Sequence, residues 1–383
     1  MGGSAKGKVR ERETVWAKFA VLTRFVALWW ACALIAGLYV VHARHIPVDF
    51  VSFWAAGRLA DLGNAAAAYD IAAHRDVEQT VLPIVGVLPF PYPPPFLLLM
   101  TLFAVPPFWV AFLLWVATTG GLYVFASSRI TDPAFALAQP SVFANGIIGQ
   151  NGFLTSGIFI AGFELMRRRP CAAGAILGAL VIKPQLAVLL PVALLAGREW
   201  KAIAGGVVSA SALLLLALLV LGPDAYRGFF EILPFYASSV SESRWQWTLI
   251  ASIFGFARWL GLSQSVSLAI HCIIAVLAAL LAARAWWIKT KQRVAILAAA
   301  TILVPPYILT YDALLLIVPL GYLLREDRSP VAIAVSWVFC LLPVLSYFEL
   351  YSGPNTVPIA ALACLWALRY EQARPAVQGA QAL

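Results

Sequence analysis

Long apolar runs recur along this chain from residue 19 to about residue 370, and only short hydrophilic breaks separate most of them. Of the 383 residues, 62% are hydrophobic and 12% are charged, whereas soluble domains carry roughly a quarter charged residues. A helix of about twenty apolar residues crosses the hydrocarbon core of a bilayer. The pattern therefore predicts an all-α polytopic membrane protein with no separate soluble domain.

We expect one integral membrane domain over residues 19–370, between a cytoplasmic N-terminal tail (1–18) and a short cytoplasmic C-terminal tail (371–383). Two long breaks, residues 42–91 and 223–262, are expected to form external loops. Up to twelve membrane segments are predicted, several of them short, at approximately 19–41, 95–105, 108–127, 133–148, 152–166, 172–196, 200–222, 264–288, 293–304, 308–324, 329–348 and 355–370.

The formal net charge of +9 comes from Lys and Arg residues that cluster in the hydrophilic breaks. Nucleic acid would suit such a charge, but confinement of the basic residues to breaks between spans is typical of the positive-inside rule. We therefore expect contact with anionic membrane lipids and no nucleic-acid partner. The basic clusters lie at 6–12, 167–169, 198–201, 284–293 and 325–328.

Strict alternation through all twelve segments leaves one conflict with this rule, because it puts residues 167–169 outside and the polar turn 149–152 inside. If one segment between 95 and 127 does not cross, the three arginines return to the cytoplasm and the turn moves outside. Residues 172–196 must then form a short hairpin. The sequence leaves both topologies open, and both keep Asp49 outside.

Asp49 is the first candidate catalytic residue. It stands in the run Pro47-Val48-Asp49-Phe50, shortly after the first apolar segment. The following residues 52–58 are predicted to form a short amphipathic helix along the membrane interface, which would fix the position of the acid. A carboxylate held at a membrane surface can act as a general base.

Lys183, in the run Lys183-Pro184-Gln185, interrupts another apolar stretch. A charge at membrane depth is costly, about 2.5–3.5 kcal/mol on insertion scales, so it requires a reason. An ammonium beside a proline-broken helix suits a phosphate group, and Gln185 could contact the same substrate. The alternatives are a lysine that snorkels to the interface or pairs with a carboxylate.

Other polar residues are candidates for substrate binding. The amides of Gln150 and Asn151, in a Gly-Gln-Asn-Gly turn, could bind sugar hydroxyls, although an ordinary interhelical turn needs no function. Tyr311 and Asp312 follow Pro305-Pro306-Tyr307, and Asp312 could orient a substrate or begin a helix. The remaining candidates are Tyr92 for substrate, Arg58 and Arg244 for donor phosphate, and Trp245 for stacking or for the aromatic belt.

No pattern indicates a cofactor. His42 and His45 precede Asp49, but two histidines just beyond a membrane span are typical of an interface, so we predict no metal site. The five cysteines show no motif spacing and are interpreted as small hydrophobic residues. There is also no Gly-rich phosphate loop, no Ser-His-Asp order and no Cys-x-x-Cys, so nucleotide hydrolysis and redox chemistry have no support in the sequence.

Taken together and in order, these motifs resemble glycosyltransferase family 87. The resemblance rests on Val48-Asp49-Phe50 with residues 55–58, the 62–70 stretch, Tyr92-Pro93-Pro94, the 149–152 turn and residues 183–185. It implies a GT-C-like bundle of about 10–12 helices, with interfacial helices in the first external loop. Members often carry Ser-Pro followed by Trp and His where this chain has residues 305–312, so no histidine role is transferred.

The resemblance implies an inverting enzyme of the bacterial plasma membrane that works on its external face. Asp49 would act as the base, and a hexose, mannose first, would move from a polyprenyl phosphate to a lipid or glycan hydroxyl. Two alternatives remain open at this point. A membrane transporter or lipid flippase would also carry scattered polar residues, and a surface-polysaccharide polymerase or ligase would use an oligosaccharide-lipid donor.

Overall fold

The computed structural model describes residues 3–46, 48–82, 86–242, 247–326 and 330–370, and these residues form helices and no strand. The first half contains α1 (Gly3–Arg44), α2 (Phe50–Asp61), η1 (Ala65–Tyr69), α3 (Ile71–Glu78), α4 (Pro94–Ala104), α5 (Phe108–Ser127), α6 (Pro133–Ala138), α7 (Pro140–Ile148), α8 (Gly152–Leu165), α9 (Pro170–Gly178), η2 (Ala179–Ile182), α10 (Pro184–Ala187) and α11 (Leu189–Gly197). The second half contains α12 (Trp200–Leu221), α13 (Pro223–Glu242), α14 (Ile253–Trp259), α15 (Gln264–Trp287), α16 (Arg293–Leu303), η4 (Thr310–Leu316), α17 (Ile317–Arg325), α18 (Pro330–Leu345), η5 (Ser346–Phe348) and α19 (Val357–Tyr370). The all-α class predicted from the sequence is confirmed.

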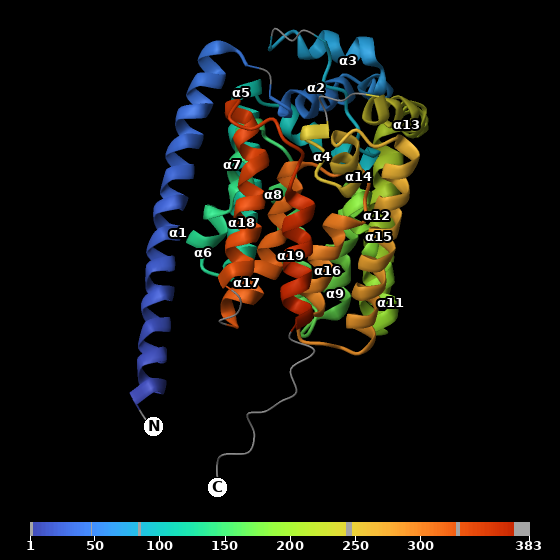
Figure 1. Cartoon of the computed structure of the whole chain (residues 1–383). Helices are drawn as coiled ribbons and strands as arrows, with labels where there is room; N and C mark the ends of the chain where they lie inside the picture. The colour runs from blue at the N-terminus through green and yellow to red at the C-terminus, as the bar shows by residue number, and fades with distance from the viewer. Residues whose placement is uncertain (1–2, 47, 83–85, 243–246, 327–329, 371–383) are drawn as a thin grey trace.

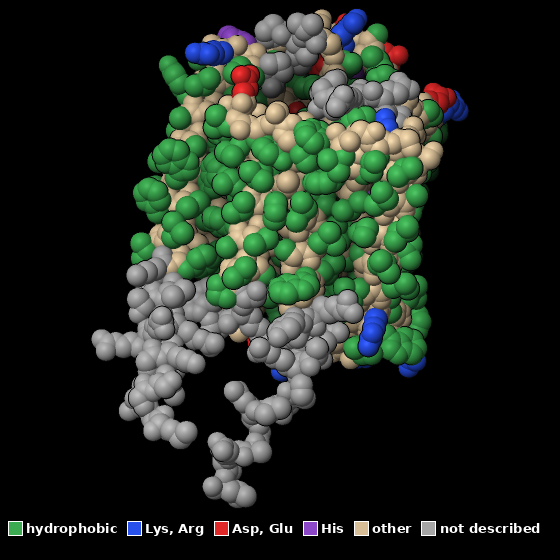
Figure 2. All heavy atoms as spheres, viewed as in Figure 1, with side chains coloured by type: hydrophobic (Ala, Val, Ile, Leu, Met, Phe, Trp, Pro, Cys, Tyr) green, Lys and Arg blue, Asp and Glu red, His purple; other side chains and the backbone are tan. Residues whose placement is uncertain are grey.

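A broad hydrophobic band crosses the face of the bundle that Figure 2 shows, with the charged side chains of that face above and below it. Five helices within the described residues are long and apolar enough to cross a membrane, at Phe19–Arg44, Phe108–Ser127, Trp200–Leu221, Gln264–Trp287 and Pro330–Phe348. Large apolar side chains on them face outward, such as Tyr39 and Leu219, which are 73% and 74% exposed. Exposed apolar surface of this extent matches a bilayer, so the chain is a membrane protein.

The two ends of the bundle differ. One end, here called the cap end, carries α2, η1, α3, α13 and α14 (Figure 1). The opposite end, here called the tail end, is where α1 begins and α19 ends. α1 runs the full height between them and begins at Gly3, so the helix extends back through most of the segment expected as a tail.

The sequence predicts a membrane segment at 95–105, but α4 stays at the cap end. Phe96 in its first turn packs on Phe53 of α2 with ring centroids 5.0 Å apart. Just beyond its last turn, the carbonyl oxygen of Pro106 accepts a hydrogen bond from Nε1 of Trp54, also on α2, at 3.1 Å. Because both ends of this helix of about 16 Å contact α2, α4 does not run the length of the bundle.

This position of α4 selects the second of the two topologies. The 149–152 turn lies at the cap end, where Gln150 contacts Asp49. Arg167 lies at the tail end, where it shares a cavity with Lys289 and Arg325. The basic breaks that the structure describes are thereby gathered at one end, as the positive-inside pattern requires.

Residues 170–197 form the hairpin that this topology needs. α9 and η2 leave the tail end, the chain turns at Lys183, and α10 and α11 return. Gly174 of α9 lies so close to α12 that a Cβ atom there would be 2.7 Å from Cα of Ala202. Small residues allow such backbone approach between membrane helices. The hairpin is therefore fixed against α12 and places Lys183 inside the bundle.

Candidate active site

Asp49 lies directly before α2, and its two neighbours hold it in place. Val48 and Phe50 are 2% and 0% exposed, and the ring of Phe50 packs against that of Phe112 with centroids 5.6 Å apart. The main-chain oxygen of Asp49 accepts a hydrogen bond from N–H of Ser52 at 3.1 Å, which begins the helix. The carboxylate itself makes no capping hydrogen bond, so it is available to other partners.

Gln150 connects Asp49 to the rest of the site. Its Nε2 donates to Oδ2 of Asp49 at 2.9 Å. Its Oε1 accepts from the hydroxyl of Tyr92 and from the main-chain N–H of Asn151, both at 3.2 Å. Because these two donors fix which end of the amide is the oxygen, the amine end must point toward the carboxylate.

The turn that carries Gln150 is tightly constrained. Gly149 has φ +70°, and a Cβ atom there would lie 2.7 Å from Cβ of Phe50, so glycine is required for both conformation and space. Nε1 of Trp115 donates to the carbonyl oxygen of Gly149 at 2.9 Å. N–H of Gly152 donates to Oδ1 of Asn145 at 2.8 Å. This Gly-Gln-Asn-Gly turn is thus packed against α2, close to Asp49.

Lys183 is enclosed at the apex of the hairpin and is only 2% exposed. Its Nζ donates to Oδ1 of Asn151 at 2.9 Å and to Oδ1 of Asp312 at 2.5 Å. The same ammonium lies 4.6 Å from the ring centroid of Tyr311, in range of a cation–π interaction. Lys183 therefore pairs with a carboxylate inside the protein and does not snorkel to an interface.

Asp312 has two structural partners. Its Oδ1 bonds Lys183, and its Oδ2 accepts from the main-chain N–H of Leu309 at 3.2 Å. It stands in the first turn of η4, so the helix-start role considered from the sequence is present together with the ion pair. A buried pair of this kind is favourable only when further hydrogen bonds satisfy both groups, and Asn151 and Leu309 supply these bonds.

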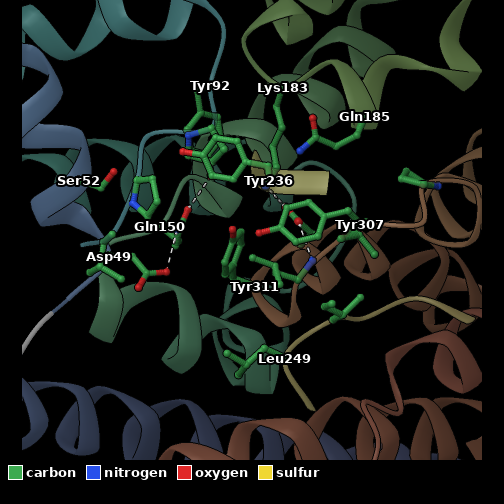
Figure 3. A pocket seen from close by; sticks show the side chains of 18 of the residues that line it. Asp49, Ser52, Tyr92, Gln150, Lys183, Gln185, Tyr236, Leu249, Tyr307 and Tyr311 are labelled. Carbon is green, nitrogen blue, oxygen red and sulfur yellow. Dashed lines mark hydrogen bonds and ion pairs between the residues drawn. The ribbon is translucent and has the colours of Figure 1, made fainter. Parts of the chain in front are cut away.

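One cavity of about 590 Å³ is lined by Asp49, Gln150, Lys183 and Asp312. Figure 3 shows the side chains of Asp49, Gln150 and Lys183 around a common space. The volume of this cavity falls within the range of small-molecule sites, about 300–1,000 Å³. The other residues that line it and carry polar side chains or aromatic rings are Ser52, Phe53, Tyr92, Gln185, Phe235, Tyr236, Tyr307 and Tyr311.

The charged side chains that line this cavity differ in whether they have an oppositely charged partner. Lys183 and Asp312 balance each other, whereas Asp49 bonds only the neutral amide of Gln150 among the described residues. Burial raises the pKa of Asp49 above its ordinary value, and the hydrogen bond from Gln150 opposes that rise. A raised pKa makes a carboxylate a stronger base near neutral pH, so Asp49 is suited to accept a proton.

The predicted site residues do not all meet at the cavity. Tyr92, Gln185 and Tyr311 line it together with the residues described above. Arg58 does not, because its guanidinium lies over the ring of Trp54, one helical turn earlier, at 5.8 Å. Arg244 and Trp245 lie outside the described residues.

The two histidines that precede Asp49 lie in the last turn of α1 and just beyond it. His42 packs edge-on against the ring of Trp109 with centroids 4.8 Å apart, and His45 is exposed. No group of three or more His, Cys, Asp or Glu side chains that could hold a metal ion occurs among the residues the structure describes.

Sequence reasoning did not single out three residues near Asp49 and Asp312. Ser52 and Tyr236 line the cavity, and their buried hydroxyl oxygens have no hydrogen-bond partner among the residues that the structure describes. Asn355 holds the far wall, because its Nδ2 donates to the carbonyl oxygens of Thr248 and Leu249 at 3.2 and 3.1 Å. The same Nδ2 lies 2.8 Å from Oγ1 of Thr310, so its two N–H groups are shared among three acceptors. Only the polar side chain of Asn355, next to an apolar helix, could have signalled this role.

Comparison with known proteins gives one positive result. The sequence profile of glycosyltransferase family 87 matches residues 90–309, which is more than half of the chain. The match covers the 149–152 turn and residues 183–185, and it ends just before Tyr311 and Asp312. No characterised protein and no solved structure was found to match.

Proposed function

Because this chain belongs to glycosyltransferase family 87, we propose that it transfers a hexose, with mannose as the first candidate, from a polyprenyl phosphate to a hydroxyl of a lipid or glycan. Membership makes it a membrane glycosyltransferase. The donor, the sugar and the acceptor are our proposal. We place the enzyme in a bacterial plasma membrane with its cap end outside, since the basic breaks gather at the tail end.

Asp49 acts as the general base in the proposed reaction. It takes the proton of the acceptor hydroxyl while the acceptor oxygen forms a bond to the anomeric carbon of the sugar. The bond between that carbon and the phosphate oxygen breaks at the same time, with inversion, and polyprenyl phosphate leaves. The support is that Asp49 is partly exposed to the cavity and has no cation among its described partners.

Lys183 stabilises the phosphate that leaves. An ammonium has three N–H donors, and two of them are used by Asn151 and Asp312. The third is available to a phosphate oxygen in the cavity that Lys183 lines. Fixed donors of this kind stabilise charge that develops in a transition state. The observation that carries the proposal is that a cavity of substrate size has in its wall an enclosed ammonium and a carboxylate with no cationic partner among the described residues.

The test is sugar transfer by Asp49→Asn in membranes or detergent with a labelled polyprenyl-phosphate hexose. A general base contributes about 10²–10⁴-fold, so we expect a loss of that order. Asp61→Asn is the matched control, because Asp61 ends the same helix and does not line the cavity. Transfer at the wild-type rate by a folded Asp49→Asn variant would remove Asp49 from the mechanism.

A further inference from the structure

A second cavity, of about 580 Å³, lies at the tail end of the bundle. It is formed by the segment after α8, the turn between α15 and α16, and the end of α17. Five of the described residues that line it are cationic, namely Arg167, Lys289, Lys291, Arg293 and Arg325. Glu164 is the single acidic residue among the described residues that line this cavity.

Membrane topology alone does not explain this arrangement. The positive-inside rule requires basic residues in the loops of one face but no cavity. Arg168, Arg169 and Lys201 meet that requirement, since they are exposed residues of the same face that do not line the cavity. Cations that come from three separate segments and meet in one hollow instead indicate an anionic ligand.

Two of the cations have partners within the protein. The guanidinium of Arg293 lies 4.7 Å from the ring centroid of Trp286, which is 0% exposed, and forms an ion pair with Glu199 at 3.4 Å. The guanidinium of Arg325 donates to the carbonyl oxygen of Arg129. Guanidinium groups fixed in this way are preorganised donors for phosphate oxygens.

The other three cations carry uncompensated charge. Arg167, Lys289 and Lys291 form no ion pair with a carboxylate among the described residues. Lys289 also stands two residues after the end of α15 with φ +52°, a conformation that favours glycine just beyond a helix. The chain keeps a cation here at a cost in backbone strain, and such outliers are frequent at functional sites.

We propose that this tail-end cavity binds the phosphate group of an anionic compound. Its volume exceeds what one phosphate needs and suits a phosphate with an attached organic group. An anionic phospholipid headgroup and a soluble phosphate ester share this chemistry. The site lies at the opposite end from Asp49 and does not depend on the proposed transfer reaction.

The experiment uses the full chain purified in detergent and two probes. Retention of phosphatidylglycerol against phosphatidylcholine is measured by native mass spectrometry, and binding of glycerol 3-phosphate by calorimetry. Binding of either probe supports the proposal, and the one that binds identifies the source of the phosphate. Binding of neither probe overturns it.

Two sets of variants locate the binding. The combined change Arg167→Gln, Lys289→Gln and Lys291→Gln should lower affinity by about tenfold or more, since charge-assisted hydrogen bonds are lost. Arg168→Gln, Arg169→Gln and Lys201→Gln remove the same charge from the same face and should leave affinity nearly unchanged. An equal loss in both sets would show attraction to net charge and overturn the proposal.

Lys289→Gly separates binding from folding. Glycine adopts a positive φ without strain, so this variant should be at least as stable as the wild type in thermal unfolding. It should nevertheless bind the phosphate probe several-fold more weakly. Unchanged affinity would remove Lys289 from the proposed site.

Discussion

Replacing Gln150 with leucine should move the acidic limb of the pH–activity profile to higher pH. Burial already raises the pKa of Asp49, and the amide of Gln150 opposes this by stabilising the ionised form. A hydrogen bond to a charged group contributes about 1.5–3 kcal/mol, and the ionised carboxylate loses this contribution when the amide is removed. Loss of the bond should therefore raise the pKa of Asp49 further above its ordinary value.

The direction of this shift in the acidic limb follows from the role of Asp49 as a base. Asp49 works only when ionised, so activity falls as pH falls through its pKa, and a higher pKa moves that fall to higher pH. The dependence of kcat/KM on pH reports ionisations of the free enzyme and is the measurement to make. Gln150→Glu should move the limb in the same direction, because a second carboxylate disfavours ionisation of the first.

The matched control is Gln264→Leu, which makes the same substitution at an exposed residue in the first turn of α15. This control should keep the wild-type profile. If Gln150→Leu remains active and its acidic limb does not move, the limb does not report Asp49, and the argument from burial and hydrogen bonding is refuted.

Three further changes test the packing of the site. Asp312→Asn leaves the ammonium of Lys183 buried without its counter-charge and should lower the free energy of unfolding by about 3–5 kcal/mol. The double change Lys183→Met with Asp312→Leu should recover much of this loss in thermal unfolding. Equal stability of the two variants would contradict a buried ion pair. Gly174→Val should separate α9 from α12 and lower the free energy of unfolding by about 1–3 kcal/mol or more. The control is Gly121→Val, because a Cβ atom at Gly121 meets nothing within 4 Å. This control should change the free energy of unfolding by no more than a small difference in helix propensity. Asn355→Ala should lower stability by about 1–3 kcal/mol, because the hydrogen bonds that hold the far wall of the Asp49 cavity are lost; unchanged thermal unfolding would show that the wall is held by packing alone.

The sequence was sufficient for the fold class because apolar runs of membrane length leave few alternatives. It could not decide the path of residues 95–105, since a short apolar segment has the same composition in a span and in a buried helix. The structure resolves this through contacts of α2 with both ends of α4. These contacts join segments far apart in the chain, and no local pattern encodes them.

The candidate site could be predicted from the sequence only in part. Asp49, Gln150 and Lys183 stand out as polar residues in or beside apolar segments, where each polar group is costly. Their convergence on one cavity was not predictable from spacing. Tyr236 gave no comparable signal, because a tyrosine in an interfacial helix has an ordinary role at a membrane surface.

The contact between Lys183 and Asp312 bears on how the chain assembles during synthesis. The two residues are 129 positions apart, so the hairpin is made long before η4 exists. Until then the ammonium has no carboxylate from η4 and must stay hydrated or associate with another acceptor. The packing of the hairpin on α12 does not depend on η4, but the ion pair of Lys183 with Asp312 can form only after η4 has been made.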